Sequence, residues 1–99
     1  MAEFAKLVFV IFRREALYSQ WESYDDETEE LIAAAATFNA AKTVMEVTAA
    51  TRDPKFSFEW KENRAGNSLL VAHKTDFYGN ECTVTYYYKS VSCYYEEGV

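Results

Sequence analysis

The sequence has few of the residues from which the common catalytic and metal-binding motifs are built. Its 99 residues include three glycines, two cysteines and one histidine, His73. A phosphate-binding loop needs closely spaced glycines, and a zinc site is typically indicated by CxxC, HExxH or a second histidine, and none of these patterns is present. The sequence also has no nucleophile motif such as GxSxG. We therefore predict a protein that is not an enzyme and that holds no metal ion or cofactor.

Long apolar runs and a disulfide framework are also lacking. There is no run of 18 apolar residues that could span a membrane. The apolar stretch 7–12 is short and no small-residue cleavage site follows it, so we expect no signal peptide. Cys82 and Cys93 fall on one segment that we expect to be extended, where they would lie too far apart to bond. We expect a single domain, residues 1–99, in a reducing cytoplasm, which is the host cytoplasm if the chain is phage-encoded.

Basic side chains are absent from one long stretch. From Glu15 to Ala41 the sequence has seven acidic residues and no lysine or arginine, in a chain of net charge −6. Neutralising phosphates requires a basic face, so this stretch disfavours direct binding to nucleic acid. The acids could serve only helix capping and solubility, or they could form a patch that docks on a basic protein surface.

The clearest amphipathic pattern predicts a helix from Asp25 to about Ala50. Asp25 or Asp26 is a suitable N-cap, and with Asp26 as the cap Glu29 occupies the capping-box position. Pro54 stops the pattern, because the residue before a proline avoids helical angles. β-Branched residues leave a strand over 43–49 as the alternative, with a shorter helix that ends at Asn39. The apolar face of the long helix would consist of Leu31, Ala34, Phe38, Ala41 and Met45.

The remaining segments predict antiparallel strands. Residues 5–14 are nearly all apolar, which is typical of a central strand, and residues 15–24 form either a strand paired with it or a loop. Alternating residues predict a strand at 56–61 and its return at 68–75. Residues 82–95 form a long strand or a bent pair, because the alternation shifts near Lys89 and Ser90. Turns are expected at 63–67, with Gly66 at positive φ, and at 76–80, with Gly79 and Asn80 as the signal.

These elements predict an α+β fold, an antiparallel sheet of four to five strands with one long helix packed across one face. The chain is short, acidic, rich in aromatic residues and free of catalytic motifs. In these respects it resembles small phage or mobile-element proteins. The resemblance implies a stoichiometric inhibitor of a nucleic-acid machine, such as an anti-CRISPR or anti-restriction protein, or an immunity protein that covers a basic nuclease toxin. In each of these, carboxylates take the place of phosphates on a basic partner.

The partner-binding residues that we expect are clustered in the acidic stretch. Three of them would act as aromatic anchors and the others would supply charge. The full set is Tyr18, Trp21, Glu22, Tyr24, Asp25, Asp26, Glu27, Glu29 and Glu30.

Two other functions remain open. A structural subunit that forms a homodimer or larger homo-oligomer would use an edge strand or the Thr- and Tyr-rich face of the sheet. A small-ligand binder would use a pocket between helix and sheet, although an alanine-rich helix packs closely and leaves little space for one.

Overall fold

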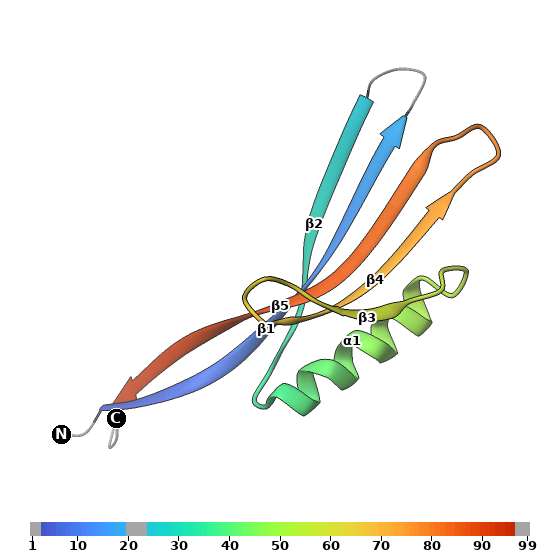
Figure 1. Cartoon of the computed structure of the whole chain (residues 1–99). Coiled ribbons are helices and arrows are strands. Elements are labelled where there is room, and N and C mark those ends of the chain that lie inside the picture. The colour runs from blue at the N-terminus through green and yellow to red at the C-terminus, as the bar shows by residue number, and fades with distance from the viewer. Residues whose placement is uncertain (1–2, 20–23, 97–99) are drawn as a thin grey trace.

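The computed structural model describes residues 3–19 and 24–96, and it confirms the predicted α+β fold (Figure 1). Five antiparallel strands form one sheet in the order β2-β1-β5-β4-β3, and a single 15-residue helix packs against it. The elements are β1 Glu3–Ser19, β2 Tyr24–Ala35, α1 Phe38–Arg52, β3 Glu59–Glu62, β4 Ser68–Thr75 and β5 Glu81–Glu96.

The two longest strands, β1 and β5, form the central axis of the molecule. They pair without interruption from Glu3 opposite Glu96 to Tyr18 opposite Glu81. The molecule is therefore elongated, 61 × 25 × 24 Å. At one end β1 and β5 continue alone as a two-stranded ribbon, and at the other end they diverge into the β1–β2 and β4–β5 hairpins (Figure 1). The pairing also shows that β5 is one strand, with no bulge or turn at Lys89 and Ser90.

The helix prediction is wrong in its first half. Residues 24–35 form strand β2, and α1 begins at Phe38 with Thr37 as its N-cap, where the Thr37 hydroxyl accepts a hydrogen bond of 3.1 Å from the Ala40 amide. The predicted N-cap at Asp25 or Asp26 and the capping box with Glu29 are therefore absent. Cross-strand pairing explains the difference, because the segment pairs along β1 from Tyr24 opposite Ser19 to Ala35 opposite Phe9, and Glu27 contacts Arg14 across the hairpin. Long-range pairing has overridden the local helical preference of this segment.

The second half of the helix prediction is confirmed. Residues 43–49 are helical, so the alternative of a strand there is wrong. The helix ends at Arg52, and the Asp53 amide donates to the Ala49 carbonyl just before Pro54. This is the end that the proline predicts.

The strand predictions differ in how well they match. β4 spans the predicted 68–75, and Gly66 and Gly79 both have positive φ, 84° and 83°. Residues 15–19 are not a separate strand or a loop but the continuation of β1, and the strand that returns along β1 is β2. β3 is only four residues long, so Phe56 and Phe58 lie in the connection from α1 rather than in a strand.

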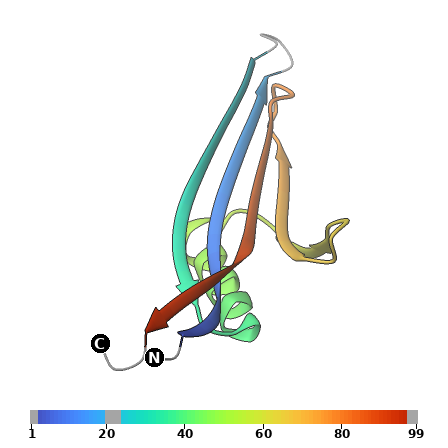
Figure 2. The ribbon, with the colours of Figure 1, turned by 90° about the vertical axis from the view of Figure 1, so that its left-hand side faces the viewer.

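The core lies between α1 and one face of the sheet (Figure 2). Three helix residues spaced by four, Ala41, Met45 and Ala49, are buried against the strands. Small alanines allow the helix to approach large strand residues closely. The strand residues of this core are Ile11, Ala35, Leu70, Val84, Tyr86 and Tyr88.

No element among the described residues covers the opposite face of the sheet. Phe12 and Tyr87 stack on this open face with ring centroids 5.3 Å apart, and the Arg14 guanidinium lies over the Tyr87 ring. Leu31 of β2, opposite Phe12, is 63% exposed. The sheet thus has one dry face and one face that is open to solvent.

Candidate functional site: an acidic edge strand, a buried arginine cluster and an aromatic pocket

The acidic residues lie on β2, which is an edge strand of the sheet. β2 pairs with β1 on one side only, so the backbone groups on its other side are unpaired within the sheet. Glu27, Glu29 and Glu30 are exposed. Asp25 and Asp26 lie on the same strand, and their side chains are outside the described part. The structure therefore places these five acids along one sheet edge, where the sequence alone had placed them on a helix.

The predicted aromatic anchors lie near the hairpin end of this edge, as far as they are described. Tyr18 on β1 is 46% exposed and lies opposite Asp25. Tyr24 begins β2, with its side chain outside the described part. Trp21 and Glu22 lie outside the described residues.

The glutamates of β2 point to both faces of the sheet. Glu27 Oε1 lies 3.0 Å from Arg14 Nε, and Glu30 Oε2 lies 2.8 Å from Arg52 Nη2 at the end of α1. The hydrogen bond from Arg52 holds the pKa of Glu30 below its usual value. Glu29 has no ion pair in the part of the chain that the structure describes. Exposed ion pairs such as these contribute little to stability, so both glutamates can exchange their arginine for another cation.

A cluster of charged side chains beneath the helix C-terminus was not anticipated from the sequence. Arg13 donates two hydrogen bonds to Asp53, from Nη2 to Oδ1 at 2.8 Å and from Nε to Oδ2 at 3.1 Å. The Tyr86 hydroxyl donates to Asp53 Oδ2 at 2.7 Å. Asp53 is 8% exposed and Tyr86 is fully buried. The only sequence signals were an arginine after an apolar strand and an aspartate before the proline.

The pKa values in this cluster follow from burial and hydrogen bonding. Burial alone would raise the pKa of Asp53, but the hydrogen bonds from Arg13 and Tyr86 outweigh it and hold that pKa below its usual value. Burial and the hydrogen bond to Asp53 raise the pKa of Tyr86 to about 12. The hydrogen bond to Asp53 raises the pKa of Arg13. The three groups therefore keep one protonation state across the physiological range, which is typical of a structural cluster rather than of acid–base catalysis.

Glu15 extends the cluster toward Cys82. Arg13 Nη1 donates to Glu15 Oε2 at 3.0 Å, and the Cys82 thiol lies 3.7 Å from Glu15 Oε1. Burial and the neighbouring Glu15 raise the pKa of Cys82. A reactive cysteine needs a lowered pKa, so Cys82 is not placed as a nucleophile.

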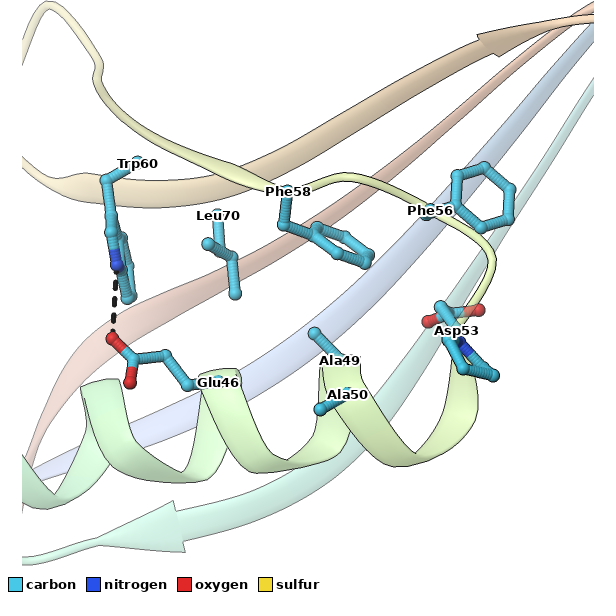
Figure 3. A pocket seen from close by; sticks show the side chains of 9 residues that line it. Glu46, Ala49, Ala50, Asp53, Phe56, Phe58, Trp60 and Leu70 are labelled. Carbon is cyan, nitrogen blue, oxygen red and sulfur yellow. Dashed lines mark hydrogen bonds between the residues drawn. The ribbon is translucent and has the colours of Figure 1, made fainter.

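An aromatic pocket lies beside the cluster, between α1 and the segment that leads into β3 (Figure 3). Its volume is about 440 Å³. At one end the Trp60 indole Nε1 donates to Glu46 Oε1 at 3.2 Å. The lining residues are Glu46, Ala49, Ala50, Asp53, Pro54, Phe56, Phe58, Trp60 and Leu70. A pocket between helix and sheet is one of the alternatives that the sequence leaves open, but no sequence pattern marks these residues as ligand contacts.

Few other side chains among the described residues could take part in catalysis or bind a metal ion. His73 Nδ1 lies 2.9 Å from the Thr83 hydroxyl on the exposed end of the β4–β5 hairpin. Within residues 3–19 and 24–96, no three metal-binding side chains come together, and no helix is long and apolar enough to cross a membrane. No protein-family model, curated protein or solved structure matches the chain.

Proposed function

We propose that this chain is a non-enzymatic, acidic protein-binding inhibitor whose edge strand β2 docks on the basic surface of a nucleic-acid-binding partner. The observation that carries the proposal is the position of the acids on an exposed sheet edge. Such an edge can meet a partner along its whole length. The functional class is that of anti-CRISPR, anti-restriction or toxin-immunity proteins, acting in the host cytoplasm.

The spacing of charge along β2 supports phosphate mimicry. Five of the six residues from Asp25 to Glu30 are acidic. A strand advances about 3.4 Å per residue, and one strand of a nucleic-acid duplex carries about one phosphate per 3.4 Å of axis. The spacing of acidic residues along this edge is therefore similar to the spacing of phosphates along one nucleic-acid strand, although Glu27 and Glu30 are paired with Arg14 and Arg52. A groove that tracks a phosphate backbone with lysine and arginine would be complementary to it.

The backbone and the aromatic residues add to the proposed interface. The unpaired backbone groups of β2 can accept a strand from the partner, which is a common mode of peptide recognition. Tyr18, Trp21 and Tyr24 would supply apolar contacts at the hairpin end, with Tyr18 partly exposed there. Charged edge strands also prevent proteins from pairing edge to edge, so the acids could protect the sheet edge instead of binding a partner. The charge-reversal variants distinguish these two roles.

Binding to a partner is tested by capture from a nuclease-treated host-cell lysate at low and high salt, with mass spectrometry of the eluate. We expect a nucleic-acid-binding protein to be retained at low salt and released at high salt, because screening weakens contacts between charged surfaces. The variant Asp25→Lys, Asp26→Lys, Glu29→Lys should lose this protein.

A matched control carries the same change of charge elsewhere. Glu59→Lys, Glu62→Lys, Glu81→Lys alters three exposed acids on β3 and β5. Each triple variant raises the net charge from −6 by six units, because each substitution adds two. The control should still retain the partner. Equal retention by both variants, or equal loss, would show that β2 has no special role.

One observation favours a second candidate function, a homo-oligomeric structural subunit. The open face of the sheet carries exposed apolar side chains, with Leu31 63% and Val91 43% exposed. A second copy could cover this face. Sedimentation at high protein concentration distinguishes the two: a monomer excludes the structural subunit, and a dimer that Leu31→Lys dissociates supports it.

A further inference from the structure

We propose that the aromatic pocket beside the helix C-terminus binds a small organic amine, a ligand with an apolar body and one ammonium group that faces Glu46. The inference goes beyond the proposed inhibitor function and does not depend on it, because none of the residues that line the pocket belongs to β2.

The shape of the pocket suits a ring-containing or alkyl ligand. Ala49 and Ala50 form the helix wall, and their small side chains leave the space open (Figure 3). Phe56 and Phe58 come from the connection that follows the helix, and Leu70 from β4. A volume of about 440 Å³ and a mainly apolar lining are usual for small-molecule sites.

Only one charged group in the lining is available to a ligand. Both carboxylate oxygens of Asp53 already accept hydrogen bonds from Arg13 and Tyr86. Glu46 is exposed and uses Oε1 for the Trp60 indole, and its Oε2 has no hydrogen bond within the described part of the chain. No lysine or arginine lines the pocket. A cation would therefore meet a free carboxylate oxygen, whereas an anion would be repelled by Glu46.

The aromatic side chains favour the same ligand charge. The Lys42 ammonium lies 4.6 Å from the centre of the Trp60 ring, and the Lys74 ammonium lies 5.8 Å from the centre of the Phe56 ring. Neither lysine lines the pocket, but both contacts place an ammonium group over an aromatic ring of the lining. A ligand ammonium that takes the place of Lys42 between Trp60 and Glu46 would make a cation–π contact and a charge-assisted hydrogen bond together.

Three probes with the same ring and different end groups test the proposal: naphthylethylamine, naphthylethanol and naphthylacetate. Each is titrated into the full chain while the Trp60 indole N–H signal is followed by NMR. We expect saturable binding, with the amine about tenfold tighter than the alcohol, since a cation–π contact and a charge-assisted hydrogen bond together contribute on this order. Naphthylacetate should bind more weakly than the alcohol.

Variants locate the site and its charge. Glu46→Gln keeps an acceptor for the indole but removes the charge, so the amine should lose its advantage of about tenfold while the alcohol binds as before. Ala50→Leu fills the pocket from an exposed helix position and should abolish binding of all three probes. Ala40→Leu makes the same change at an exposed position of α1 that does not line the pocket, and it should leave binding unchanged. Circular dichroism confirms that each variant is folded.

Each other result overturns the proposal. Failure of the amine to saturate at millimolar concentration would show that the pocket is not a site for such ligands. Equal affinities for the amine and the alcohol, or a preference that persists in Glu46→Gln, would remove the role of charge. Unchanged binding in Ala50→Leu would place the ligand elsewhere on the protein.

Discussion

Arg13 and Arg14 are neighbours in the sequence, but they lie on opposite faces of β1 and meet carboxylates in different surroundings. Arg13 points beneath the helix, where its side chain is 11% exposed and binds Asp53 through two hydrogen bonds. Arg14 points to the open face, where its side chain is 46% exposed and contacts Glu27 by a single nitrogen. The difference separates two uses of charge in one small domain. Charge on the dry face joins the end of the helix to the sheet, whereas charge on the open face is exposed to solvent.

Removing each arginine in turn should have very different effects on stability. Arg13→Met leaves the carboxylate of Asp53 buried without its cation, and breaking such a pair costs about 3–5 kcal/mol. Arg14→Met removes an exposed contact that contributes about 0–1 kcal/mol. Urea denaturation of both variants measures the free energy of unfolding. A loss below about 1 kcal/mol in Arg13→Met would mean that the cluster does not hold the helix to the sheet.

Apolar side chains on the two faces should show the same contrast on a smaller scale. Met45 of α1 is fully buried, and Met45→Ala leaves a cavity that should cost about 2–4 kcal/mol. Leu31 is 63% exposed, so Leu31→Ala should change the free energy of unfolding by less than about 1 kcal/mol. The same urea titration measures both. A large loss in Leu31→Ala would instead indicate that the open face is covered in solution, as in the homo-oligomer.

These contrasts also explain which parts of the structure the sequence could predict. Turn residues with one preferred backbone geometry, such as Gly66 and Gly79, placed the β3–β4 and β4–β5 hairpins correctly. Pro54 placed the helix end for a similar local reason. Each of these signals acts within a few residues of the chain, so no knowledge of the tertiary contacts was needed.

The segment 24–35 could not be assigned locally. Glutamate and alanine are strong helix formers, and Leu31 is in phase with the real helix residues Phe38, Ala41 and Met45, so the apolar period appeared continuous. What makes the segment a strand is its pairing with β1, and neither the register of that pairing nor the contact of Glu27 with Arg14 can be seen in the periodicity of the segment itself. The pairing changes the candidate site as well, since it moves the acids from a helix end to a sheet edge.

The buried cluster and the pocket could not be predicted from the sequence either, because each is built from residues of separate elements. Asp53 follows the helix, Arg13 lies on β1 and Tyr86 on β5, so the three meet only after the sheet and helix have packed. The pocket likewise needs β3 to be short, which leaves Phe56 and Phe58 in the connection that passes over α1. Spacing in the sequence carries no signal for either arrangement.

The smallest expected effect concerns the pH dependence of stability on the dry face. The pKa of Tyr86 is about 12 in the folded protein and its ordinary value is 10. Its contribution is therefore fully present below pH 10 and is lost as the pH rises toward 12, because the unfolded chain releases the phenol proton first. Urea titrations across this range should show a steeper loss of stability in the wild type than in Tyr86→Phe. Parallel pH profiles for the wild type and Tyr86→Phe would show that Tyr86 does not donate to a charged Asp53, and the contrast between the two faces would then rest on Arg13 alone.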